Sequence, residues 1–186
     1  MNLSRISCLC LLVLALPAQA VEFNRVLPER SQIAFVTTQM GASVAGGVRN
    51  FRVDLAFDPD SPASAHARIE IDLASIDAGS EEGNNDVKGA DWLHVAAYPK
   101  AHFESTSVRS LGRGRYEVRG RLSIHGRSHE VKSRFTFARL GSEGIFHGRF
   151  NIKRLDYGIG QRVWGDTGVV SDAIRIKFRI VVESGG

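Results

Sequence analysis

Cysteine is almost absent from this 186-residue chain, and its position limits the chemistry. The two cysteines, Cys8 and Cys10, both lie within the first 20 residues. Arg5 gives this stretch a positive start, residues 8–16 form a short apolar core, and small residues follow Pro17, an order typical of a secretory signal peptide. That core is too short to cross a bilayer. We therefore expect residues 1–20 to be removed, leaving residues 21–186 as one exported domain without a disulfide.

Clusters of catalytic or metal-binding residue types are also lacking. The six histidines are scattered along the chain, and only His125 and His129 lie close together, across a turn and without an adjacent carboxylate or thiolate. No phosphate loop, dinucleotide fingerprint or zinc-finger spacing occurs. We therefore expect no catalytic residue, no metal, no cofactor and no nucleic-acid partner.

Net charge is small, at +4, and does not by itself indicate a partner. Its distribution is uneven, because acidic residues predominate between Asp54 and Asp91, whereas basic residues predominate between Arg109 and Arg139. Neighbouring strands of opposite charge can pair across a sheet, which is the simpler interpretation. The alternative is a basic patch for phosphate or anionic lipid, with transient contact between residues 109–139 and the inner membrane surface.

What the chain has in abundance is alternation of apolar and polar residues. The pattern recurs about eight times in segments near ten residues long, for example where Phe51, Val53 and Leu55 flank Arg52 and Asp54. Period two is the signature of strands, and the short connections favour an antiparallel meander. Closing such a sheet removes its exposed edges. We therefore predict an all-β fold, an eight-stranded antiparallel barrel, with a two-sheet sandwich as the alternative.

The predicted inward face carries almost no ionisable group. It consists of Phe, Ile, Val and Leu, while small residues such as Gly120 and Gly148 are expected to leave space among them. A small barrel with an apolar lining is suited to hold an apolar chain, because each buried methylene contributes about 0.8 kcal/mol. The residues between Met40 and Gly47 are small and glycine-rich, which favours a turn or a close backbone approach.

One stretch, residues 85–105, interrupts the alternation. Asn85 or Asp86 is suited to cap a short helix, and Tyr98-Pro99 ends it, because the residue before a proline avoids the helical region. We expect a short helical lid around residues 85–95 that covers one end of the barrel. In the loop between residues 155 and 171, the stretch from Asp156 to Gly160 is either a head-group site or an ordinary structured turn.

Six stretches, in this order and spacing, resemble the YceI-like family of bacterial exported proteins over essentially the whole mature chain. They are Ser31-Gln32-Ile33-Ala34-Phe35, Gly46-Gly47-Val48-Arg49-Asn50-Phe51, Ile71-Asp72-Leu73-Ala74-Ser75-Ile76-Asp77-Ala78-Gly79, Tyr98-Pro99-Lys100-Ala101-His102-Phe103-Glu104-Ser105, Gly120-Arg121-Leu122-Ser123-Ile124-His125-Gly126 and Arg154-Leu155-Asp156-Tyr157-Gly158-Ile159. Two positions depart from the family. It often has two aromatics and an aspartate where this chain has Trp92-Leu93-His94, and phenylalanine is frequent where Tyr157 stands.

The resemblance implies a lipocalin-like barrel in the periplasm that holds a long polyisoprenoid, such as a quinone tail or a polyprenyl phosphate. It links the protein to storage or transport of that lipid and to stress responses, as a monomer or homodimer, and not to catalysis. The alternatives are a partner-binding or structural protein without a lipid, and an isoprenoid-modifying enzyme that uses Asp156, Tyr157 and Arg162.

The predicted ligand site combines the inward face of the barrel with the lid and the barrel mouth. Its apolar members are Phe35, Phe51, Val53, Leu55, Ile71, Trp92, Leu93, Tyr98, Phe103, Leu122, Phe135, Phe150, Ile152, Tyr157, Trp164, Ile176 and Phe178. The predicted head-group residues are Arg154, Asp156 and Arg162.

Overall fold

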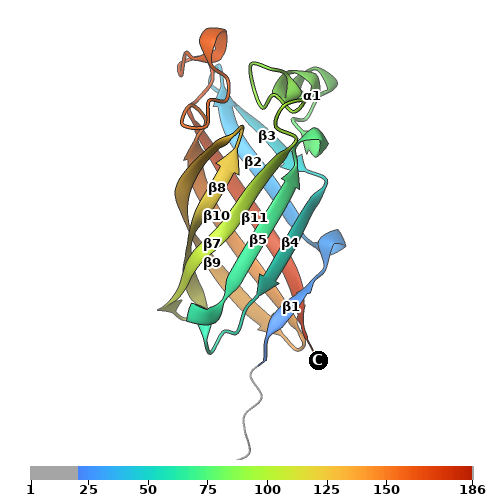
Figure 1. The fold of residues 1–186 in the computed structure, drawn as a ribbon, viewed down its shortest axis with the longest axis vertical. Coiled ribbons are helices and arrows are strands. Elements are labelled where there is room, and N and C mark those ends of the chain that lie inside the picture. The colour runs from blue at the N-terminus through green and yellow to red at the C-terminus, as the bar shows by residue number, and fades with distance from the viewer. Residues whose placement is uncertain (1–20, 186) are drawn as a thin grey trace, which may run out of the picture.

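The computed structural model describes residues 21–185 and consists mainly of long antiparallel strands (Figure 1). The strands are β1 (Phe23–Val26), β2 (Gln32–Gln39), β3 (Ala42–Val48), β4 (Phe51–Ala56), β5 (His66–Asp72), β6 (Ile76–Asp77), β7 (Lys100–Gly112), β8 (Arg115–Ile124), β9 (Arg127–Leu140), β10 (Glu143–Lys153) and β11 (Ala173–Ser184). The helical elements are α1 (Glu81–Lys88) and the short 3-10 turns η1 (Pro28–Arg30), η2 (Pro62–Ser64), η3 (Leu73–Ser75) and η4 (Arg162–Trp164).

All these strands belong to one sheet that curls into a barrel. Its order is β4-β5-β7-β8-β9-β10-β11-β2-β3-β6, and each strand in this order pairs antiparallel with its neighbours. The predicted antiparallel barrel is therefore confirmed, with short additional strands beyond the eight expected. Closure is less regular than expected, because no ladder joins β4 to β3 or β6 within residues 21–185. At the lower end β1 fills this seam by pairing with β11, and Phe23 forms a bridge with Phe57.

Two local predictions hold only in part. Met40 and Gly41 form a turn, but residues 42–47 belong to strand β3, where the expected close backbone approach occurs at Gly46: a Cβ there would lie 2.3 Å from the Asp77 carbonyl oxygen. A lid helix is present, but it runs over Glu81–Lys88 and not around residues 85–95. Its cap is Ser80, whose Oγ accepts a hydrogen bond from the Gly83 amide at 3.0 Å, and Glu81 and Glu82 in the first turn favour a start there. Within residues 21–185, no helix is long and apolar enough to cross a membrane.

Charges on the outer face pair only in part as the sequence predicted. The acidic strands β4 and β5 and the basic strands β8 and β9 are not neighbours, because β7 lies between them. Ion pairs instead connect β7 to each side, as in Arg68–Glu104 at 2.9 Å toward β5 and Arg109–Glu117 at 2.9 Å toward β8. Further round the barrel, Arg134, Arg149 and Lys177 lie directly opposite one another on β9, β10 and β11. Like charges in this arrangement lower sheet stability.

A cluster of aromatic rings closes the lower end of the barrel, opposite α1. Phe57, which follows β4 and is 3% exposed, lies 4.8 Å from the ring centroid of Phe137 and 5.1 Å from those of Phe146 and Tyr116. Most of these contacts have the edge-to-face geometry that aromatic rings prefer. Phe23 packs on the same cluster, at 5.0 Å from Phe137. This aromatic plug anchors the seam where β1 meets the chain after β4.

We expect Phe57→Ala to lower the free energy of unfolding by about 3–5 kcal/mol, because it removes the central ring of a buried cluster. Denaturant unfolding monitored by circular dichroism measures the loss. Phe51→Ala, at the opposite end of β4 and only half-buried, is the matched control and is expected to cost less. Equal losses for the two variants would contradict a special role for the plug.

Candidate functional site: a two-part apolar interior

The barrel interior contains two adjoining cavities, which together are the candidate ligand site. The lower cavity has a volume of about 140 Å³ and the upper one about 490 Å³. Both are lined by Ile33, Ile71, Leu122, Phe150 and Ile176. Because these side chains border both spaces, the two cavities form one elongated interior with a constriction between its parts.

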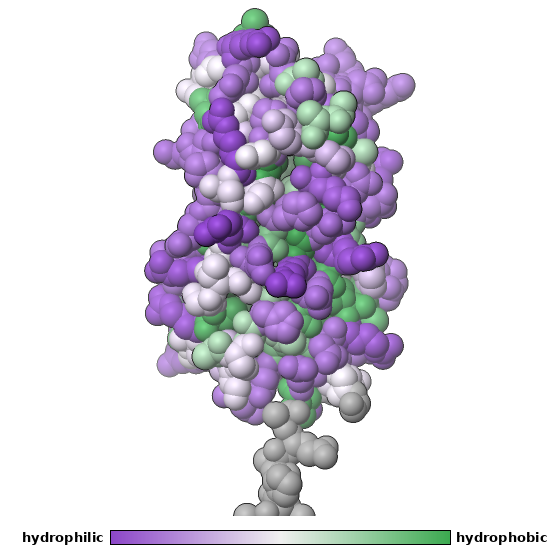
Figure 2. Space-filling model, viewed as in Figure 1, coloured by the Kyte–Doolittle hydropathy of each residue, from purple (hydrophilic) through white to green (hydrophobic). Residues whose placement is uncertain are grey.

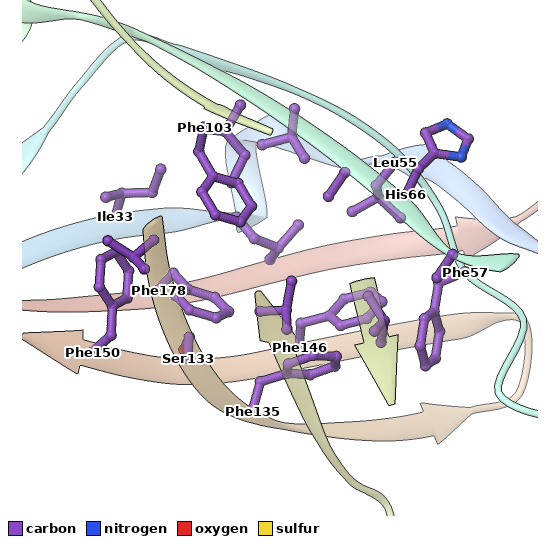
Figure 3. Close-up of a pocket in the computed structure, with 18 of the residues that line it drawn as sticks. Ile33, Leu55, Phe57, His66, Phe103, Ser133, Phe135, Phe146, Phe150 and Phe178 are labelled. Carbon is purple, nitrogen blue, oxygen red and sulfur yellow. The ribbon is translucent and has the colours of Figure 1, made fainter. Parts of the chain in front are cut away.

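The lower cavity is almost purely apolar (Figure 3). Phe135 and Phe146 from β9 and β10 point into it near Phe57 of the aromatic plug, and Phe150 and Phe178 border its other end (Figure 3). Only His66 and Ser133 bring polar groups, and the Ser133 hydroxyl donates to the Arg149 carbonyl at 3.3 Å. A space of this kind offers hydrophobic burial and no polar recognition.

Glycines on the barrel wall keep this interior hollow by seating phenylalanine rings. A Cβ placed on Gly148 would lie 2.1 Å from the ring of Phe178, its cross-strand neighbour, and one on Gly46 would lie 2.3 Å from the ring of Phe35. A Cβ on Gly120 would likewise lie 2.5 Å from the ring of Phe103. The space expected beside these glycines is therefore filled, and the rings lie along the wall and not across the interior.

Replacing one of these glycines tests whether the contact between glycine and phenylalanine ring determines the size of the cavity. Gly148→Ala is expected to displace the Phe178 ring toward the interior, lower stability by about 1–3 kcal/mol and reduce the space for an apolar ligand. Denaturant unfolding gives the first effect, and uptake of a hydrophobic fluorescent dye gives the second. The paired change Gly148→Ala with Phe178→Leu should restore dye uptake; failure to restore it would contradict the seating role.

The upper cavity is covered by two segments that lie side by side at the same end of the barrel (Figure 1). The lid segment (residues 81–98) comprises α1 and the turns after it, and the β10–β11 loop spans residues 154–172. Backbone hydrogen bonds hold the turns of the lid segment, for example from Trp92 N to Gly89 O at 3.1 Å. One further backbone hydrogen bond, from Gly160 N to Asp91 O at 2.9 Å, joins the lid segment to the β10–β11 loop.

On the outer surface, hydrophilic side chains cover much of the face shown in Figure 2, and hydrophobic side chains lie between them in its lower half.

Two tryptophans, one from each segment, meet over the upper cavity. The rings of Trp92 and Trp164 lie 5.6 Å apart, and both residues line the cavity together with Leu93, which is 5% exposed. The predicted lid residues Trp92 and Leu93 thus face the interior. The Nε1 of Trp92 is covered from solvent and has no hydrogen-bond partner within the described chain.

The guanidinium of Arg154 holds the β10–β11 loop over the cavity. The side chain is fully buried, and its five N–H groups donate to the carbonyl oxygens of Ser171, Ile159, Gly160, Trp164 and Val170. Burial lowers its pKa, whereas the charge of Asp172 acts in the opposite direction. Arg154 lines the upper cavity, and its Cζ lies 5.7 Å from the Trp92 ring centroid. The predicted head-group residue therefore places a positive charge at the site but has no N–H left to donate.

The other predicted head-group residues lie outside both cavities. The Asp156 side chain is exposed, and that of Arg162 is 85% exposed, with its Nη1 3.9 Å from Asp91 Oδ1. Three predicted apolar members, Phe51, Tyr98 and Tyr157, also line neither space. Tyr98 is 38% exposed and packs outward against His125, at 4.7 Å between ring centroids.

The remaining predicted apolar members do line the interior, divided between its two parts. Val53, Leu55, Phe103, Phe135 and Phe178 border the lower cavity, Phe35, Trp92, Leu93, Ile152 and Trp164 border the upper one, and Ile71, Leu122, Phe150 and Ile176 border both.

Several lining residues were missed at the sequence level, for two different reasons. Val131 and Phe146 occupy inward positions of the alternating pattern, so the pattern itself could have identified them as part of the site. Leu73 also continues the alternation of Ile69 and Ile71, whereas Val170 lies in an irregular segment, where no period indicates which way a side chain faces. The close pair His125 and His129 contacts carbonyls of the β10–β11 loop, and no cluster of metal-ligating residues occurs within residues 21–185.

Tyr157, in the β10–β11 loop, is buried, and its hydroxyl has no hydrogen-bond partner in the described structure. Burial raises its pKa to about 12, and the charge of Asp156 adds to the shift. Because the folded state retains the proton longer than the unfolded state, the stability linked to this group is complete below pH 10 and is lost as the pH rises toward 12.

We expect Tyr157→Phe to raise the free energy of unfolding at neutral pH by about 1 kcal/mol, because it removes an unsatisfied buried hydroxyl. The variant should also lose about 2–3 kcal/mol less than the wild type between ~pH 9 and ~pH 12. Denaturant unfolding across this range measures both effects. Parallel alkaline curves for the two proteins would show that Tyr157 is not the group responsible.

Comparisons with known proteins agree with this architecture. The YceI-like domain model matches residues 25–182. A UPF0312 protein of Azotobacter vinelandii is 30% identical over 151 residues, which cover 76% of this chain and 79% of the relative. A UPF0312 protein of Ectopseudomonas mendocina is 27% identical over 172 residues, which cover 87% of this chain and 88% of the relative.

Two solved structures share the fold. BcnA of Burkholderia cenocepacia superposes with a TM-score of 0.82 at 35% identity, covering 84% of this chain and 98% of that one. A domain from Saccharophagus degradans, described as polyisoprenoid binding and implicated in plant cell wall breakdown, gives a TM-score of 0.65 at 15% identity. The alignment covers 90% of this chain and 100% of the Saccharophagus degradans domain, and at 15% identity the similarity supports the fold alone.

Proposed function

Because the chain belongs to the YceI-like family, we propose that it is a carrier that holds a polyisoprenoid chain in the two adjoining cavities of its barrel. The observation that supports this most is the elongated apolar interior beneath a two-part lid. The Saccharophagus degradans domain, described as polyisoprenoid binding, has the same fold and supports a lipid-binding role.

The shape and chemistry of the interior favour a long apolar chain over a compact ligand. The upper cavity, at about 490 Å³, falls within the range of small-molecule sites, and the lower one extends it toward the aromatic plug. Each buried methylene contributes about 0.8 kcal/mol, so a few isoprene units suffice for tight binding without a polar contact. An apolar cavity of this size lowers stability by several kcal/mol when nothing fills it, which favours an occupant.

The two ends of the interior differ, and this difference sets the direction of the ligand. The lower end is closed by aromatic rings, whereas the upper cavity contains Thr37, Gln39, Ser80, Asp86 and Arg154 among its lining residues. The proposal therefore places the tail toward the plug and the polar head group beneath the lid. Exchange with a membrane or a partner then takes place at the lid end.

We further propose that the carrier acts in the periplasm, after removal of the predicted signal peptide. Residues 1–20 lie outside the described residues, so this part of the proposal depends on the sequence of that stretch. Storage or transport of a quinone tail or a polyprenyl phosphate is the corresponding role. A binding protein is favoured over an isoprenoid-modifying enzyme, because Asp156 and Arg162 lie away from the cavities and the Tyr157 hydroxyl faces packed side chains.

Mass spectrometry of the organic extract of natively expressed protein tests the proposal. We expect an isoprenoid lipid in near-stoichiometric amount from the wild type and a several-fold smaller amount from Ile176→Trp, because Ile176 borders both cavities and the larger ring fills the constriction. Arg175→Trp is the matched control, since Arg175 is exposed on the outer face of the same strand. No lipid from the wild type, or equal amounts from both variants, would sink the carrier proposal.

A further inference from the structure

The lid places one unused hydrogen-bond donor at the roof of the upper cavity. Trp92 lines this cavity, and its Nε1–H is covered from solvent with no partner in the described chain. Leaving a buried donor unpaired costs about 1–3 kcal/mol, and buried polar groups in native proteins are generally satisfied. A donor retained at the wall of a ligand cavity is therefore suited to bind an acceptor that the ligand brings.

The Trp92 ring meets Gly160 of the β10–β11 loop through the edge opposite Nε1. A Cβ on Gly160 would lie 3.0 Å from Cζ3 and 3.2 Å from Cε3 of the indole, and these atoms form the edge opposite Nε1. The Arg154 Cζ lies 5.7 Å from the centroid of the Trp92 ring, and the centroid of the Trp164 ring lies 5.6 Å from it. The ring is thus fixed in place.

Two of the other side-chain donors around the upper cavity are engaged within the protein. All five N–H groups of Arg154 bind backbone carbonyls, and the Thr37 hydroxyl donates to the Ala173 carbonyl at 3.3 Å. Ser80 Oγ accepts the capping hydrogen bond of α1, and Asp86 offers a carboxylate, which accepts and does not donate when ionised. Gln39, the half-buried last residue of β2, adds an amide to the lining. Among the side-chain donors that line this cavity, Trp92 Nε1 is the one that is covered from solvent and has no partner within residues 21–185.

Charge favours the same kind of ligand atom. The Arg154 guanidinium is buried beside Trp92, and its hydrogen bonds go to neutral carbonyls, with no carboxylate within ion-pair distance among the described residues. A cation in such surroundings attracts partial or full negative charge more strongly than it would in water. An oxygen that accepts from the indole therefore also gains from the nearby charge.

We infer that Trp92 Nε1–H donates a hydrogen bond to an oxygen of the ligand's head group, so that the carrier selects isoprenoids that end in a carbonyl or phosphate oxygen over plain isoprenoid hydrocarbons. This rests on the proposed carrier function. The indole N–H donates and cannot accept, so it discriminates by head-group chemistry, whereas the apolar interior discriminates by length and shape.

Trp92→Phe is the direct test, because it retains an aromatic ring and removes the donor. The probes are a short-tailed ubiquinone, farnesyl phosphate, and farnesene, a hydrocarbon of comparable tail length. We expect the variant to bind at least one of the two oxygen-bearing probes about tenfold more weakly, the factor that one hydrogen bond contributes, and to bind farnesene unchanged. The probe that loses affinity identifies the acceptor as quinone or phosphate oxygen. Tyr98→Phe removes a polar group from the same lid segment at a residue that lines neither cavity, so it is the matched control and should change none of the three affinities.

A second measurement follows the head-group contact in the wild type. The indole N–H resonance of Trp92 in NMR spectra should shift on addition of an oxygen-bearing probe and stay in place with farnesene; the Trp164→Phe spectrum assigns it. Unchanged affinities in Trp92→Phe, equal losses for all three probes, or a resonance that ignores the head group would overturn the inference. Failure of the wild type to bind any probe would instead overturn the carrier function, so the two failures are distinguishable.

Discussion

The roof of the interior depends on the burial of one arginine. The β10–β11 loop contains several glycines and no regular strand, so its own sequence gives it little conformational preference. Arg154 compensates by donating to five carbonyl oxygens spread from Ile159 to Ser171. A guanidinium is suited to this task, because its five donors are held in a rigid plane and it stays charged when buried. The fixed loop in turn positions Trp164 against Trp92, and so determines where the lid segment lies.

The barrel walls are subject to a different constraint, because the phenylalanine side chains of a small barrel tend to fill its interior. Protein interiors normally pack to the density of organic crystals, and an interior that must admit a ligand has to resist this. Here the rings of Phe178, Phe35 and Phe103 rest on glycines of neighbouring strands. Each ring is thereby packed against backbone and still leaves the centre free. The wall glycines thus serve close packing and openness together, in contrast to the aromatic plug, where rings pack on one another.

The alternating pattern was sufficient to predict the antiparallel barrel and most of its apolar lining, because period two specifies both the strand and the face. Residues such as Val53, Leu122 and Ile176 follow from it directly. It failed where side chains are small or the backbone is irregular. Strand β3 was not identified, because Ala, Ser and Gly give no contrast between faces, although the close approach expected for this stretch occurs at Gly46. The sequence also could not show that all N–H groups of Arg154 donate to backbone carbonyls, or that Asp156 and Arg162 face outward. Side-chain direction in loops follows no period, so no pattern indicates it.

Together, these features make the two ends of the interior chemically different, which neither the fold alone nor the composition alone would indicate. At the lower end, the rings of Phe57, Phe137 and Phe146 meet and present no polar atom, so an apolar tail can end there at no desolvation cost. The upper cavity is lined by the buried cation Arg154, by Trp92 with its unpaired indole N–H and by several polar side chains among apolar ones. A pure hydrocarbon would satisfy the first end and leave the second unsatisfied. A compact polar ligand would do the reverse, whereas a long apolar chain with an oxygen at one end matches both, and this match is the physical basis of the proposed carrier role.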